Sequence, residues 1–181
     1  MYIWTGLVFN KKDEDNIRNI CKKINTKFNL SELAFTLPQH ISIKTSFFTD
    51  NYMEIKEYIK DILKDQKKFI INIVGISKIN NGVIWLDIEE TEPLRNIHNL
   101  LNLKLNEKYN IPLSKFDGES FHFHSTLFQD NIISNEHQEL IDEINNELIF
   151  PITIKINEID FGISEIGSVG TFRVVDSIVL K

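Results

Sequence analysis

Two short segments of this chain repeat one pattern, a histidine followed two residues later by a hydroxyl side chain. His40 and Ser42 stand in LPQHISIKTSF, and His124 and Thr126 stand in FHFHSTLF. Because side chains two apart in a strand point to the same face, each segment would present an imidazole beside a hydroxyl. Apolar neighbours indicate that the strands are partly buried. We expect a fold that brings the two polar pairs to face each other.

The rest of the chain predicts alternating strands and helices. Asn80-Asn81-Gly82 indicates a hairpin turn, and Thr91 is a candidate helix cap. Each half holds a His-bearing strand, a helix and a hairpin, which predicts an internal pseudo-twofold duplication and two antiparallel sheets in an α+β fold. The expected strands are 1–9, 40–47, FIINIVGI, VIWLDIE, 121–128, 152–161 and 171–180, and the expected helices are about 13–28, 53–63, 91–110 and 135–148.

Charge and length limit the partners. The 181 residues carry a net charge of −6, with only three arginines. No global positive field would attract nucleic acid, so tight binding to long duplexes is not expected. A small nucleotide or an RNA end remains the expected partner. The N-terminal apolar run MYIWTGLVF is too short to cross a membrane or to form a signal peptide. We expect a cytoplasmic monomer with no membrane partner, and Cys21 as a buried core thiol.

The paired triplets suit phosphodiester cleavage. That reaction needs a base on the nucleophile, an acid on the leaving oxygen and donors on the non-bridging oxygens. Histidine, with an ordinary pKa of about 6.5, serves as either base or acid near neutral pH. Ser42 and Thr126 would donate to the phosphoryl oxygens. Strand alternation puts Lys44 on the face of His40, where it would add positive charge without a metal.

A third histidine leaves an alternative open. His122 lies two residues before His124 and would share its face if the strand is regular, which favours a contact with the substrate. The His-x-His pattern also suits a metal, with His40 as a third ligand and an open position for water. His98 and His137 lie on helix faces and are expected to be structural.

The same residues carry a resemblance to a known family. PQHISIK resembles the Pro-x-His-x-Thr strand of the two-histidine (2H) phosphoesterases, and FHFHSTL resembles their Phe-x-Pro-His-x-Thr-Leu strand. Bacterial members are described as RNA 2′,3′-cyclic phosphodiesterases or 2′-5′ RNA ligases. Ser42 replaces the commoner threonine and keeps the hydroxyl, and Phe123 replaces the usual proline. Neither departure removes a catalytic group.

The resemblance implies a single bilobal phosphoesterase domain over residues 1–181, with outer helices flanking a central cleft. It implies His40 and His124 as the catalytic pair, Ser42 and Thr126 as phosphate-binding hydroxyls, and chemistry without a cofactor. We expect a metal-independent phosphodiesterase acting on a 2′,3′-cyclic phosphate or a 2′-5′ linkage of nucleotides or RNA ends. The alternatives are a non-catalytic nucleotide or RNA-end binding protein and a three-histidine metal-dependent hydrolase.

Overall fold

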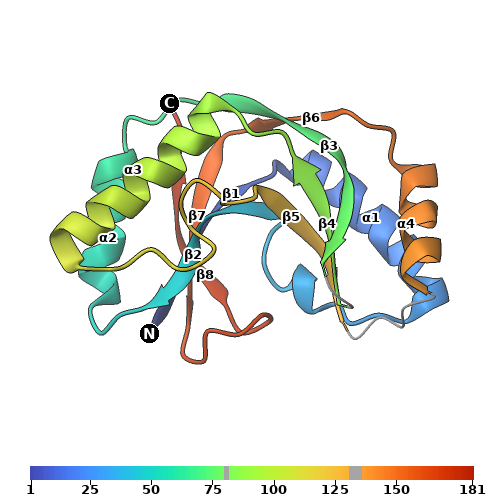
Figure 1. The fold of residues 1–181 in the computed structure, drawn as a ribbon, viewed down its shortest axis with the longest axis horizontal. Helices are drawn as coiled ribbons and strands as arrows, with labels where there is room; N and C mark the ends of the chain where they lie inside the picture. The colour runs from blue at the N-terminus through green and yellow to red at the C-terminus, as the bar shows by residue number, and fades with distance from the viewer. Residues whose placement is uncertain (80–81, 131–135) are drawn as a thin grey trace.

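The computed structural model describes residues 1–79, 82–130 and 136–181 of the chain. It has the expected α+β class, with helices interspersed among the strands along the sequence (Figure 1). The predicted turn residues Asn80 and Asn81 lie outside the described part. The elements are β1 (Tyr2–Val8), α1 (Lys11–Phe28), the short 3-10 helix η1 (Leu33–Phe35), β2 (His40–Phe48), α2 (Tyr52–Leu63), β3 (Phe69–Ile79), β4 (Val83–Ile88), α3 (Glu92–Tyr109), β5 (His124–Gln129), α4 (Glu136–Glu147), β6 (Ile152–Ile156), β7 (Glu158–Ser164) and β8 (Arg173–Val179).

Two four-stranded antiparallel sheets form the centre of the fold, with strand orders β2-β1-β7-β8 and β5-β4-β3-β6. Each half of the sequence contributes to both sheets. The first half supplies β1 and β2 to the first sheet and β3 and β4 to the second. The second half supplies β5 and β6 to the second sheet and β7 and β8 to the first. The two sheets are therefore interwoven along the chain.

The single strand expected over 152–161 is wrong. The chain divides at Asn157 into β6 and β7, which belong to different sheets. The buried side chains Ile154 and Ile156 are followed by Ile159 and Phe161, so the two-residue period slips by one at the break. A slip of one residue turns the apolar side chains to the other face of a continuing strand. Two strands in two sheets avoid that exposure.

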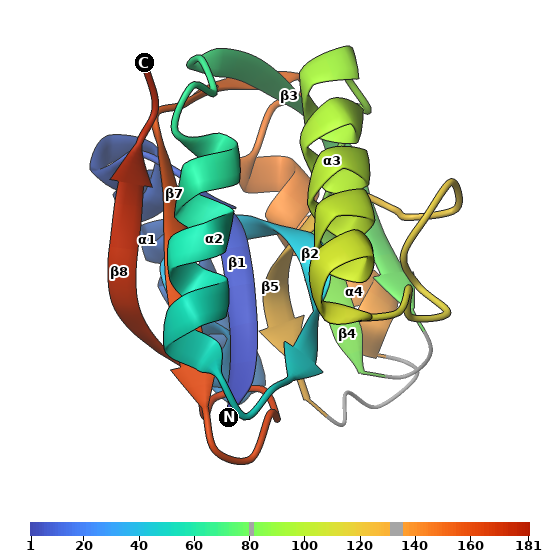
Figure 2. The same ribbon diagram turned by 90° about the vertical axis from the view of Figure 1, so that its left-hand side faces the viewer.

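The helices cover the sheets with amphipathic stripes. Figures 1 and 2 show α2 beside α3 at one end of the molecule, with α1 beside α4 at the other. In α1, Asn10 caps the first turn by accepting from the amide of Asp13 at 3.2 Å. Ile17, Cys21 and Ile24 are buried on one side of α1, as the spacing predicts. Thr91 occupies the cap position of α3, but its side chain makes no capping bond.

The two histidine strands meet where the sheets adjoin. The buried Gln39 side chain donates from Nε2 to Ser125 Oγ at 2.7 Å and to the Thr126 carbonyl at 3.0 Å. Ser125 Oγ donates in turn to the His40 carbonyl at 2.6 Å. Buried polar groups need such partners to offset their lost hydration. This relay joins β2 of one sheet to β5 of the other.

Helix α1 fixes the segment that leads into β2. The Glu14 carboxylate accepts from the backbone amide of Gln39 at 3.1 Å and forms an ion pair with Arg18 at 3.0 Å. The Arg18 guanidinium also donates to the carbonyls of Phe35 and Leu37. The backbone just before His40 is thus held by one acidic and one basic side chain of the same helix.

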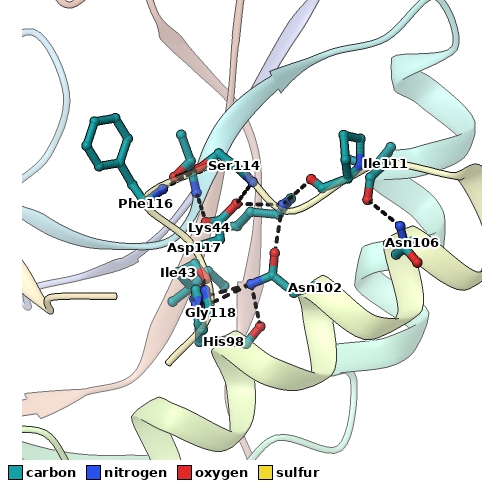
Figure 3. A network of polar contacts seen from close by, with 12 residues as sticks. Ile43, Lys44, His98, Asn102, Asn106, Ile111, Ser114, Phe116, Asp117 and Gly118 are labelled. Atoms are coloured by element: carbon teal, nitrogen blue, oxygen red, sulfur yellow. Dashed lines mark hydrogen bonds and ion pairs between the residues drawn. The ribbon is translucent and has the colours of Figure 1, made fainter. Parts of the chain in front are cut away.

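The alternation that placed Lys44 beside His40 is wrong. Gly6 of β1 pairs with Ser42, and the residue before it, Thr5, pairs with Lys44, so Ile43 is an extra residue in β2. Such a bulge changes which side chains share a face. Lys44 is 2% exposed and lies inside the protein (Figure 3). Its ammonium is therefore turned away from the face that carries His40.

The Lys44 ammonium has a complete set of buried partners. Nζ lies 2.7 Å from Asn102 Oδ1 and 3.0 Å from Asp117 Oδ2. Asp117 also accepts from the amides of Thr45 and Ser114 at 3.0 and 2.9 Å. Burial alone would raise the pKa of Asp117, but these amide hydrogens and the ammonium together hold the pKa below its usual range. The ion pair fastens the α3–β5 loop onto β2.

His98 completes this network, as Figure 3 shows. Its Nδ1 bonds to the Ile43 carbonyl at 2.9 Å, and its Nε2 accepts from the Gly118 amide at 3.0 Å. A ring that donates at Nδ1 and accepts at Nε2 is the neutral tautomer. Burial, the largest influence, lowers the pKa of His98 and favours the same neutral form. The structural role expected for His98 agrees with these contacts.

Replacing Lys44 with methionine leaves the Asp117 carboxylate buried without its cation. We expect Lys44→Met to reduce the free energy of unfolding by about 3 kcal/mol in urea denaturation at pH 7. Lys60→Met is the control, because Lys60 is partly exposed and its partner Asp176 keeps a second ion pair with Lys56. The control should cost less than about 1 kcal/mol. Equal losses would contradict the role assigned to Lys44.

Candidate active site

His40 begins β2 with its imidazole held at one nitrogen. Nδ1 lies 2.6 Å from the carbonyl of Pro38, two residues earlier. A carbonyl only accepts, so Nδ1 carries the hydrogen and Nε2 of the neutral ring keeps its lone pair. The indole of Trp4 meets the ring edge-on, with centroids 4.4 Å apart at 70°. The ring is therefore fixed in both tautomer and orientation.

His124 begins β5 with the same arrangement. Its Nδ1 bonds to the carbonyl of His122, again two residues earlier, at 2.8 Å. The indole of Trp85 lies against its ring at 4.3 Å and 32°. Each histidine thus donates from Nδ1 to its own backbone and has a tryptophan from the neighbouring strand against its ring. In both neutral rings Nε2 is the nitrogen left to act as a base.

The two triplets lie side by side. The Ser125 side chain of the second triplet donates from Oγ to the backbone carbonyl of His40 in the first triplet. Within each triplet the middle residue, Ile41 or Ser125, is buried with 0% exposure, whereas the outer residues are partly exposed. We call the outer residues the histidine face: His40, Ser42, His124 and Thr126. The structure brings these four predicted residues to one junction between the sheets.

Both histidines of this face favour the neutral form. Burial is the main cause that lowers the pKa of His40 to about 4, and the nearby His124 and Arg18 act in the same direction. Burial also lowers the pKa of His124, although its bond to the His122 carbonyl opposes the shift. The electrostatic effect of His124 on His40 agrees with their proximity. A bound anion would favour protonation of either ring.

Asp87 on β4 organises the surroundings of His124. Its Oδ1 accepts from Trp85 Nε1 and His122 Nε2, both at 2.9 Å, and its Oδ2 accepts from Ser77 Oγ at 2.5 Å. The rings of His122 and His124 are nearly parallel, 13° and 6.0 Å apart. His122 therefore lies beside the histidine face, with 55% of its side chain exposed.

The structure gives limited support to the three-histidine metal site. The Nε2 of His122 is engaged by the Asp87 carboxylate, so Nδ1 is the ring nitrogen that could bind a metal. Among residues 1–79, 82–130 and 136–181, no group of three His, Cys, Asp or Glu side chains is arranged to hold a metal ion. The geometry places His122 beside His124.

Four residues that support the site belong to no motif in the sequence: Gln39, Trp4, Trp85 and Asp87. Trp4 lies in the apolar run MYIWTGLVF, and Asp87 lies near the end of VIWLDIE. Trp85 and Asp87 are two apart, which does place them on one face of a strand. Their relation to His124 appears only because β4 pairs with β5, with Asp87 opposite His124. The pairing of strands distant in sequence supplied this part of the site.

A cavity of about 550 Å³ lies between the end of β2, the start of α2 and the end of α3. No residue of the histidine face lines this cavity. In the described part of the chain, we find no helix with the length and apolar character needed to span a membrane.

The fold resembles several solved structures. TT0787 of Thermus thermophilus superposes with a TM-score of 0.72 at 12% identity, over 99% of this chain and 98% of that one. Apo LigT of E. coli gives 0.62 at 14% identity, over 99% and 96% of the two chains. Usb1 of Kluyveromyces marxianus gives 0.51 at 14% identity, over 99% and 98%. At these identities the likeness establishes a shared fold.

A search of curated protein sequences gave no match. The family description "2′-5′ RNA ligase superfamily" matches residues 13–165, which include both histidine triplets. The match covers most of the chain and agrees with the resemblance seen in its two strands. The chain belongs to the 2′-5′ RNA ligase superfamily of two-histidine phosphoesterases.

Proposed function

We propose that this protein is a metal-independent phosphodiesterase that acts on 2′,3′-cyclic phosphates or 2′-5′ linkages of nucleotides and RNA ends. The observation that carries the proposal is the matched tethering of His40 and His124. Each imidazole donates from Nδ1 to its own backbone, which leaves Nε2 to exchange a proton. Two such rings at one junction satisfy the need for a base and an acid.

The proposed reaction on a 2′,3′-cyclic phosphate balances with these groups. One neutral Nε2 takes a proton from water as the water oxygen bonds to phosphorus. The other ring, protonated in the bound state, gives its proton to the ribose oxygen as the P–O bond breaks. Ser42 and Thr126 donate to the non-bridging oxygens as charge develops there. The product is a ribose phosphomonoester, and the two rings have exchanged protonation states.

The charge of the histidine face favours a phosphodiester over a phosphomonoester. Lys44, expected to supply a positive charge, pairs with Asp117 inside the protein. The remaining donors on this face are two hydroxyls and two imidazoles with lowered pKa values. Such a site suits a singly charged diester better than a doubly charged monoester. The same difference would promote release of the product.

Known relatives support a small nucleotide as the ligand. LigT of E. coli has been solved with 3′-AMP, with NADP+ and with ATP, so that protein accommodates nucleotides of several sizes. Here the tethered histidines favour an enzyme over a non-catalytic binding protein, because a binding site gains nothing from two imidazoles with lowered pKa values.

Replacing either histidine should abolish turnover. We expect His40→Ala and His124→Ala each to lower kcat about 10³-fold on 2′,3′-cyclic nucleotides or 2′-5′ dinucleotides, since each removes a proton-transfer group. Chromatographic product analysis with and without EDTA measures the effect. His98→Asn tests whether losing any buried histidine has the same result, with folding checked by circular dichroism.

The chelator experiment and the variants can each contradict a different part of the proposed function. Activity that disappears with EDTA and returns with added metal would refute metal independence. Nucleotide binding without any turnover would support the binding-protein alternative. Wild-type rates in both histidine variants would refute the catalytic assignment.

The pH profile should reflect the lowered pKa values of the pair. The base must be neutral, so kcat/KM rises as pH passes its pKa, and the acid must be protonated, so kcat/KM falls above its own pKa. With the pKa of His40 at about 4 and that of His124 also lowered, both limbs lie below the ordinary value. We expect a bell-shaped profile with its optimum below about pH 6.5. An optimum above about pH 7.5 would show that the rings are not held in this environment.

A further inference from the structure

The indole of Trp4 rests on the backbone of two glycines. A Cβ atom on Gly6 would overlap the indole, and one on Gly162 would lie 2.7 Å from its Cε3 atom. Gly162 of β7 is the direct partner of Trp4, and Gly6 follows two residues later on β1. Side chains at either position would displace the ring. The two glycines and the 5% exposure of Trp4 show that the indole is buried and packed in one position.

In this position Trp4 contacts both outer residues of the first triplet, His40 and Ser42. Its ring packs against His40, and its Nε1 donates to Ser42 Oγ at 3.0 Å. A hydroxyl has two acceptor lone pairs and one hydrogen. Because the indole nitrogen can only donate, the Ser42 hydrogen must point elsewhere. Within the described part of the chain, no side chain or carbonyl is seen to accept that hydrogen.

We propose that Trp4 is a positioning residue that fixes the Ser42 hydroxyl as a donor to a phosphoryl oxygen. The indole occupies one lone pair of Oγ and so directs the O–H away from the indole, which leaves it free to meet a bound phosphoryl oxygen. Serine turns more freely about χ1 than β-branched threonine. The indole bond therefore supplies a constraint that threonine, common at this position in the family, has from its branching. The inference rests on the proposed function in taking the histidine face as a phosphoryl site.

The second triplet provides a matched comparison within the same chain. Trp85 packs against His124 as Trp4 packs against His40. Its Nε1, however, donates to Asp87 and not to the hydroxyl of Thr126. The indole and the hydroxyl should therefore be coupled in the Trp4–Ser42 pair and uncoupled in the Trp85–Thr126 pair.

A double-mutant cycle on the full chain tests this coupling with inorganic phosphate as the probe, in mildly acidic buffer where phosphate carries the single charge that suits this site. Calorimetric titration would compare wild type with Trp4→Phe, Ser42→Ala and the double variant. We expect each single change to weaken phosphate binding about tenfold, and the double variant to bind no more weakly than Ser42→Ala. In the control cycle of Trp85→Phe and Thr126→Ala, the fold-losses of phosphate affinity from the two single changes should multiply in the double variant.

Indole NMR tests the contact without relying on Trp4 variants folding. In Ser42→Ala, the Nε1–H signal of Trp4 should shift and exchange faster with water, because it loses its acceptor. The signal of Trp85, bonded to Asp87, should stay in place. A Trp4 signal that does not respond to Ser42→Ala would overturn the inference.

Failure of the inference and failure of the proposed function give different results. In one outcome, the affinity losses of Trp4→Phe and Ser42→Ala multiply in the double variant, while His40→Ala still loses turnover. That outcome would overturn the positioning role alone. A coupled cycle in a protein that cleaves no phosphodiester would support the positioning role and refute the enzyme. A wild-type protein with no affinity for phosphate would overturn the positioning role whatever its turnover.

Discussion

The hydrogen-bond relay through Gln39 and Ser125 joins the two sheets at the point where both histidines begin their strands. Gln39 donates to Ser125 and to the Thr126 backbone, and Ser125 donates to the backbone of His40. These groups are buried, so separating the strands would leave several polar atoms without partners. The requirement that they stay paired fixes the distance between the two triplets. The site depends on this junction more than on either strand alone.

Around the junction, the two histidines make equivalent contacts, but the tryptophans that pack against them form different hydrogen bonds. Each ring donates to the carbonyl two residues before it and packs against a tryptophan of the adjacent strand. The first tryptophan bonds to a hydroxyl of the histidine face, and the second bonds to Asp87, which also holds His122. The duplicated pattern thus supports two chemically distinct surroundings.

Local sequence periodicity predicted the helices, most strands and the four residues of the histidine face, because these follow from side chains that alternate within one element. It failed where strand pairing intervenes. An extra residue follows the hydroxyl in both histidine strands, Ile43 in β2 and Leu127 in β5. Beyond these bulges two side chains turn inward and are buried: Lys44, expected on the face of His40, and Phe128, two residues after Thr126. A bulge depends on the register with the partner strand, which periodicity within one segment does not contain.

The central claim is that two separate segments of the chain make one phosphoryl site. Long-range ¹H–¹⁵N NMR of the imidazoles during a titration with singly charged phosphate, in mildly acidic buffer, tests it most directly. We expect the Nδ1–H tautomer for both rings before addition, and then movement of both Nε2 signals with one shared dissociation constant. Movement of only one ring, or two unrelated constants, would contradict a shared site.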